Sequence, residues 1–166
     1  MQKISLKVCD QQKGEAQLRN WSNGEYTHII NMAKEPNGFQ GLCWNLPNIP
    51  QLMHSIYPDA LFLLTVRSNA DEWYNSLKRF VAVANKFNIG GCGVDEVHKI
   101  IYNATLNEAD KLKKHYNDYN ETMRNYFITN KANFLELNLA DKDSSKKLCD
   151  FVGIEFTEVG HFNKTA

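Results

Sequence analysis

The clearest pattern along the chain is a run of apolar residues from Leu61 to Val66, which follows the turn Tyr57-Pro58-Asp59-Ala60. A short continuous apolar run after a turn is typical of a strand that is buried on both faces of a parallel sheet. A core helix segment is the alternative, and the length of the run and its flanking turn favour the strand. A second run, Phe134 to Leu139, alternates apolar and polar positions and predicts a strand nearer the edge of the sheet.

Helical periodicity occupies most of the remaining chain. Apolar positions three and four apart predict a helix that begins at Ala70, with Asn69 as its N-cap and Glu72 three residues later. A longer periodic stretch from Val94 to Phe127 predicts either one helix or two helices joined near residues 103–107. The shorter elements are a short strand or strand-like entry over Ile4–Cys9, helices over Gln12–Trp21, Glu25–Lys34 and Gln51–Ile56, and a last helix that Asp143-Ser144-Ser145 caps and that runs to about Phe151.

The order of these elements predicts the fold class. Strands separated by helices favour an α/β fold, here helix-rich and with a small, mostly parallel sheet. A length of 166 residues suits one domain, and no internal repeat interrupts it. We therefore expect a single domain over residues 1–166.

Composition narrows the classes of partner. Lys plus Arg and Asp plus Glu each number 19, so the formal net charge is zero and nothing attracts the whole chain to nucleic acid or an anionic membrane. No run approaches the roughly 20 apolar residues of a membrane span, and the first residues lack a signal-peptide core. We expect a cytoplasmic protein with no nucleic-acid or membrane partner.

Four scattered cysteines without a Cys-x-x-Cys pair predict free thiols and no metal site.

Candidate chemistry lies where the first apolar strand ends, because ligands of open α/β sheets bind beyond the carboxyl ends of the strands. Arg67 directly follows this strand and offers a planar cation suited to phosphate. The N-terminus of the next helix favours anions, and Ser76, about two turns into that helix, adds a hydroxyl. These residues predict a phosphate pocket. The alternative is that Arg67 pairs with a surface carboxylate and that Ser76 is simply exposed.

The same residues resemble a known family. The segment from Tyr57 to Arg67, followed by Glu72-Trp73-Tyr74-Asn75-Ser76-Leu77, is similar to the 3′-phosphate-binding segment of sulfotransferases that use PAPS (3′-phosphoadenosine-5′-phosphosulfate). Weaker similarities to this family occur at Leu6–Gln11, Phe134–Leu139, Lys147–Ile154 and His161–Lys164.

This resemblance implies a P-loop NTPase-like three-layer sandwich and a specific reaction. The chain would move a sulfuryl group from PAPS, its co-substrate, to a hydroxyl or amine acceptor without a metal. Arg67 and Ser76 would hold the 3′-phosphate of PAPS, and Lys164 would contact the nucleotide. The partners are then a small-molecule nucleotide and an acceptor that the sequence does not identify.

Two features depart from the family pattern. Arg67 and Ser76 are nine positions apart, one more than is usual. No Gly-x-x-x-x-Gly-Lys-Ser/Thr loop occurs to bind the 5′-phosphosulfate, and the glycine-rich stretch Asn88–Gly93 follows a helix and is interpreted as a helix break. We therefore expect an N-terminally incomplete sulfotransferase-like domain that either keeps or has lost the transfer reaction. The first strand of this domain would have an uncovered edge open to self-association.

Two other functions remain open. One is a non-catalytic α/β interaction module, or a remnant of the fold that has lost the reaction. The other is a different P-loop enzyme such as a nucleotide kinase, which explains the helix from Trp73 to Ser76 less well. The histidines at 28, 54, 98 and 115 are candidate general bases by residue type alone. We expect His98 and His115 on solvated helix faces, and we assign no base.

Overall fold

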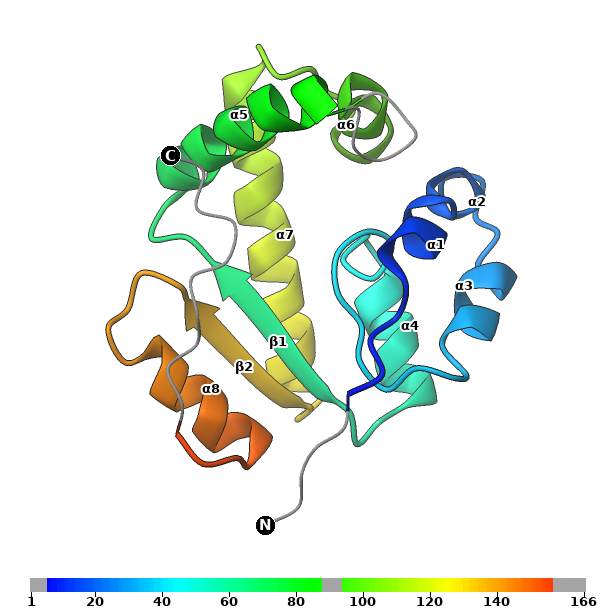
Figure 1. The fold of residues 1–166 in the computed structure, drawn as a ribbon, viewed down its shortest axis with the longest axis vertical. Helices are drawn as coiled ribbons and strands as arrows, with labels where there is room; N and C mark the ends of the chain where they lie inside the picture. The colour runs from blue at the N-terminus through cyan, green and yellow to red at the C-terminus, as the bar shows by residue number, and fades with distance from the viewer. Residues whose placement is uncertain (1–5, 88–93, 157–166) are drawn as a thin grey trace.

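A two-stranded parallel sheet lies at the centre of the structure, a computed structural model that describes residues 6–87 and 94–156 (Figure 1). Strand β1 (Leu61–Val66) pairs with β2 (Asn133–Asn138) along its whole length. Both strands were expected from the sequence, β1 at these bounds and β2 shifted by one residue. The helix-rich α/β class is confirmed.

Helices lie on both sides of this sheet, and they are named here in chain order (Figure 1). They are α1 (Gln11–Glu15), α2 (Leu18–Ser22), α3 (Thr27–Met32), α4 (Ile49–Ile56), α5 (Ala70–Phe87), α6 (Val94–Tyr102), α7 (Ala109–Thr129) and α8 (Ser144–Val152). The long periodic stretch is therefore two helices. Of the two readings of residues 4–9, the described residues 6–9 form no strand, and Val8 makes only an isolated bridge to Gly38.

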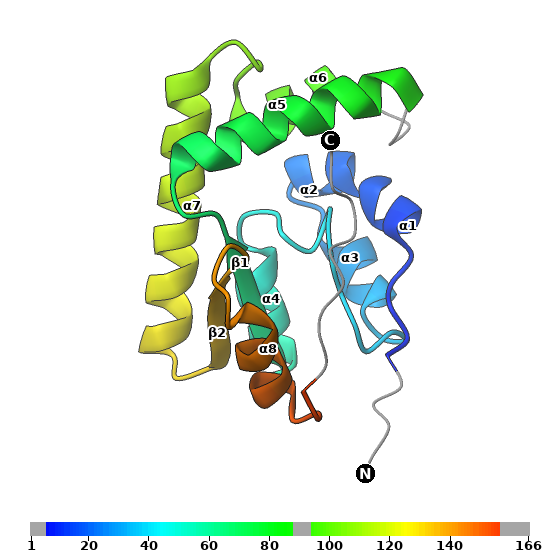
Figure 2. The ribbon, with the colours of Figure 1, turned by 60° about the vertical axis from the view of Figure 1, so that its left-hand side comes forward.

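The sheet is sandwiched between α7 on one face and α8 on the other (Figures 1 and 2). On the α7 side, the ring of Phe127 stacks on Phe62 of β1 at 4.5 Å and on Phe134 of β2 at 5.2 Å between centroids. On the opposite side, Leu137 of β2 and Cys149 of α8 are both buried. Alternation along the strands therefore directs apolar side chains into both layers.

Strand β1 is less covered than its apolar sequence predicts. Val66 is buried on the α7 side, but Leu61 is 51% exposed and Leu63 is 43% exposed on the other side. The expectation that β1 is buried on both faces is wrong. Among the described residues, α8 lies on the face opposite α7, and it packs on β2. An open apolar surface therefore runs along β1.

The helices before β1 contribute their own core. The side chains that pack most tightly there are Leu18, Ile29, Cys43, Leu46 and Ile49, each less than 2% exposed. Burial raises the pKa of the Cys43 thiol to about 11, so this thiol stays protonated. Cys9 and Cys43 are free thiols, as expected. Within the described ranges, no helix is long and apolar enough to cross a bilayer.

Candidate functional site

The junction between β1 and α5 carries the residues that the sequence singled out. The Oδ1 atom of Asn69 accepts a hydrogen bond from the N–H of Glu72 at 2.8 Å, and the Asn69 carbonyl accepts one from the N–H of Trp73 at 3.1 Å. This confirms Asn69 as the cap that begins α5. The capped turn fixes the direction in which the chain leaves β1.

Tyr116 of α7 holds the backbone of Arg67. The N–H of Arg67 donates to the Tyr116 hydroxyl at 2.8 Å, and this hydroxyl lies 3.2 Å from the Arg67 carbonyl oxygen, to which it donates. The Tyr116 ring stacks on Trp73 of α5, with 4.8 Å between ring centroids and 19° between ring planes. The base of the Arg67 side chain is thus anchored to two helices as well as to the strand.

The structure brings Arg67 and Ser76 together. The Arg67 Nη2 atom lies 3.4 Å from the Ser76 Oγ, so the additional residue between them does not separate the two side chains. In the described part of the chain, no carboxylate pairs with the exposed Arg67 guanidinium. The nearby charge of Asp71 is neutralised by Lys113, whose Nζ lies 2.5 Å away. A free cation and a hydroxyl therefore face the same space, an arrangement that favours an anion.

The third candidate, Lys164, lies outside the described residues, and so does the glycine-rich stretch Asn88–Gly93. The structure therefore gives a position for two of the three expected nucleotide contacts. Within residues 6–87 and 94–156, no three His, Cys, Asp or Glu side chains gather as a potential metal site.

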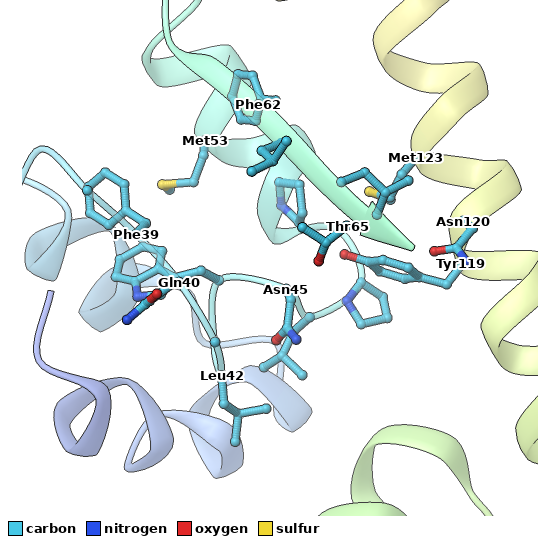
Figure 3. Close-up of a pocket in the computed structure, with 18 of the residues that line it drawn as sticks. Phe39, Gln40, Leu42, Asn45, Met53, Phe62, Thr65, Tyr119, Asn120 and Met123 are labelled. Carbon is cyan, nitrogen blue, oxygen red and sulfur yellow. The ribbon is translucent and has the colours of Figure 1, made fainter. Parts of the chain in front are cut away.

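Arg67 and Ser76 line a cleft of about 1690 Å³ that also runs along β1. Figure 3 shows Met53 and Phe62 on its apolar side, and the hydroxyls of Thr65 and Tyr119 pointing into it. Helices α5, α6 and α7 supply much of the remaining wall. A cleft that combines apolar walls with a few polar groups is the usual form of a small-molecule site.

The edge of β1 opposite β2 also faces this cleft. The Leu139 N–H donates to the Val66 carbonyl at 3.3 Å, so alternation turns the backbone groups of Leu63 and Thr65 away from β2. Within the described part, these groups have no hydrogen-bond partner. The expected uncovered edge is therefore present among these residues, whereas self-association through it stays a prediction.

Two histidines lie in the same wall, contrary to the expectation of solvated helix faces. His98 of α6 is only 4% exposed, and burial lowers its pKa although Asp95 opposes the shift. His115 of α7 is partly buried, and burial lowers its pKa against the opposing charge of Asp118. The expectation is wrong because α6 and α7 pack against each other. The spacing of His98 three residues before Ile101 is the signal that could have indicated a buried face.

Two tyrosines continue this row of rings. The centroid of Tyr102 lies 5.5 Å from that of His98 and 4.7 Å from that of His115, and the His115 ring lies 6.5 Å from that of Tyr119. Burial raises the pKa of Tyr102, and burial together with Tyr102 raises that of Tyr119 to about 12. Both phenols are therefore uncharged at neutral pH and able to donate a hydrogen bond.

Comparison with protein families places this site inside a known domain. The model of a family described as "Sulfotransferase domain" matches residues 41–165, a range that contains β1, α5 and β2. No curated protein and no solved structure matched the chain.

Proposed function

Since the chain belongs to the sulfotransferase domain family, we propose that it uses PAPS as sulfuryl donor and that Arg67 and Ser76 bind the 3′-phosphate of this nucleotide. The acceptor is a hydroxyl or an amine. The observation that carries the proposal is the Arg67 guanidinium, which pairs with no carboxylate among the described residues and lies 3.4 Å from the hydroxyl of Ser76 in the capped helix α5.

These residues fit a phosphate by charge and by shape. A guanidinium donates two parallel hydrogen bonds to phosphate oxygens, and the hydroxyl of Ser76 supplies a third donor. The N-terminal end of α5 adds the positive end of its dipole. Tyr116 keeps the Arg67 backbone in place, so the backbone does not have to be ordered when the nucleotide binds.

In the proposed reaction, the bond between sulfur and the 5′-phosphate oxygen breaks as a bond from sulfur to the acceptor oxygen or nitrogen forms. The acceptor loses a proton, and 3′-phosphoadenosine-5′-phosphate (PAP) leaves. The cleft beside Arg67 is large enough for both substrates, and its walls are partly apolar.

A non-catalytic nucleotide-binding module is the second candidate. One observation favours it: the 166 residues of this sequence contain no Gly-x-x-x-x-Gly-Lys-Ser/Thr motif, the kind of loop that neutralises a phosphosulfate. Such a module would bind PAP through the same Arg67 and Ser76 but would transfer no sulfuryl group. Incubation with radiolabelled PAPS and a mixture of phenols, alcohols and amines separates the two, because only the enzyme yields labelled acceptor.

Calorimetric titration with PAP tests the nucleotide site itself. We expect the unmodified chain to bind PAP, and Arg67→Ala to bind it at least about tenfold more weakly, as expected for lost charge-assisted hydrogen bonds. Arg19→Ala is the matched control because it also removes a guanidinium, one that pairs with Glu96 at 2.9 Å on the surface of α2. Absence of binding at millimolar PAP, or equal affinities of the two variants, would contradict the proposal.

A further inference from the structure

We propose that the cleft beside β1 binds one extended segment of a partner polypeptide, which pairs with the free edge of this strand and hydrogen-bonds to the side chain of Asn120. The bound segment carries apolar side chains. This inference does not rest on the function proposed above, because neither Arg67 nor Ser76 supplies a side chain to it.

Asn120 of α7 is the polar side chain that indicates a ligand. It is 7% exposed, it lines the cleft, and its amide makes no hydrogen bond within the described part of the chain. A buried amide without partners is unfavourable, whereas a leucine of similar volume would not be. Figure 3 shows Asn120 beside the C-terminal end of β1. The donors and the acceptor of this amide are therefore unsatisfied where the cleft meets the end of the strand.

The free edge of β1 indicates the kind of ligand. The backbone groups of Leu63 and Thr65 point away from β2 and have no hydrogen-bond partner among the residues that the structure describes. Their N–H and C=O groups repeat at every second residue, a spacing that another extended backbone matches. Peptides bind to exposed sheet edges by adding a strand in this way. A peptide group also supplies the acceptor and the donor that Asn120 lacks.

Tyr116 sets one end of the open edge. By the same alternation, the backbone groups of Arg67 face this edge, but the Tyr116 hydroxyl is 2.8 Å from the N–H nitrogen of Arg67 and 3.2 Å from its carbonyl oxygen. Both groups are therefore already paired. The run that is open to pairing lies between Leu61 and Thr65, and a segment of about five residues covers it.

The walls of the cleft determine the form of the occupant. Leu61 and Leu63 are exposed on one side of the edge, and Met53 and Phe62 line the cleft as well, so apolar side chains on the bound segment are favoured. Figure 3 shows Asn45, in the segment that leads into α4, across the cleft from β1. A cleft bounded in this way favours one extended chain over the folded sheet of a second copy.

Fluorescence anisotropy with a labelled peptide tests the site. The probe is fluorescein-Lys-Val-Thr-Val-Thr-Val-Lys-amide, and we expect saturable, micromolar binding to the unmodified chain. The control peptide has the same sequence with methyl groups on two adjacent central backbone nitrogens. It keeps every side chain but lacks an N–H on each edge, so it should bind at least about tenfold more weakly.

Asn120→Leu tests the unpartnered amide. We expect about fivefold to tenfold weaker peptide binding, with a melting temperature equal to or above that of the unmodified chain because an unsatisfied amide is removed. A purely structural Asn120 would give a lower melting temperature and an unchanged peptide affinity. Asn117→Leu is the matched control, since Asn117 lies exposed on the same helix, and it should bind the peptide as the unmodified chain does.

Amide hydrogen exchange measured by NMR locates the bound peptide. The N–H groups of Leu63 and Thr65 should exchange at least about tenfold more slowly with the peptide present. The N–H of Leu64 faces β2 and is the internal control, because its exchange should not change.

Four results would overturn the inference: no binding at millimolar peptide, equal affinity for the methylated peptide, unchanged exchange at Leu63 and Thr65, or a dimer in sedimentation that excludes the peptide and so assigns the edge to a second copy. If Asn120→Leu fails to fold by circular dichroism, the methylated peptide and the exchange measurement on the unmodified chain decide. Titration with PAP separates the two proposals, because loss of peptide binding with PAP binding retained contradicts only the peptide site, and the reverse contradicts only the nucleotide site.

Discussion

Removing the hydroxyl of Tyr116 should loosen Arg67 without touching its guanidinium. Tyr116→Phe keeps the ring and its stacking on Trp73, but it eliminates the hydrogen bonds to the Arg67 N–H at 2.8 Å and to the Arg67 carbonyl at 3.2 Å. This change therefore tests only the contribution of α7 to the position of Arg67. Tyr116 lies 49 residues after Arg67 in the sequence.

The magnitude follows from these two hydrogen bonds. Each has a net value of about 0.5–1.5 kcal/mol, and water replaces part of it because Arg67 is exposed. We expect Tyr116→Phe to lower the free energy of unfolding by about 1–2 kcal/mol, or the melting temperature by about 3–6 °C. A loosened Arg67 must be ordered again when PAP binds, so we expect the affinity for PAP to fall by about threefold to tenfold.

Tyr126→Phe is the matched control. The Tyr126 hydroxyl also has two partners, His54 Nδ1 at 3.2 Å and the Gln51 carbonyl at 3.4 Å, but it lies about 15 Å further along α7. Thermal unfolding and PAP titration of both variants form the assay. We expect comparable destabilisation and a loss of PAP affinity only in Tyr116→Phe. Equal PAP affinities for the two variants would refute the role of Tyr116 in positioning Arg67.

Three further changes test the fold around the site. Asn69→Ala removes the cap of α5 and should lower the free energy of unfolding in urea by about 1 kcal/mol; an unchanged midpoint would show that the cap does not stabilise α5. Phe127→Ala removes the ring, 3% exposed, that joins α7 to both strands and should cost about 3–5 kcal/mol by the same assay; a loss below about 1 kcal/mol would contradict this packing. Lys111 and the Thr105 N–H lower the pKa of Glu108 from 4.5 to about 2, so its contribution to stability is complete above about pH 5 and declines as the pH falls toward 2. The melting temperature of Glu108→Gln should therefore lie below that of the unmodified chain at pH 7 and approach it near pH 2.5; a constant difference would contradict the depressed pKa.

Local patterns were sufficient to predict the elements that form the nucleotide site. The bounds of β1 follow from its apolar run, and Asn69 is the kind of residue that caps helices whatever surrounds it. The juxtaposition of Arg67 and Ser76 also follows from one strand, one turn and one helix. All of this information lies between Tyr57 and Ser76.

What the sequence did not predict depends on contacts between distant segments. The anchoring of Arg67 by Tyr116 and the burial of His98 arise only when α6 and α7 pack against α5. The exposure of Leu63 depends on α8 covering β2 instead of β1. The turn before α7 is different, because Thr105-Leu106-Asn107-Glu108 is a Thr-x-x-Glu pattern that could have been recognised locally, and the Glu108 carboxylate accepts a hydrogen bond from the Thr105 N–H at 2.8 Å.

The most direct test of the nucleotide site compares two ligands that differ only in the 3′-phosphate. Calorimetric titrations of PAP and adenosine 5′-phosphate, each into the unmodified chain and into Arg67→Ala, give four affinities. We expect the unmodified chain to prefer PAP by at least about tenfold, and Arg67→Ala to lose most of this preference while its affinity for adenosine 5′-phosphate stays the same. An undiminished preference for PAP in Arg67→Ala would show that the 3′-phosphate binds elsewhere.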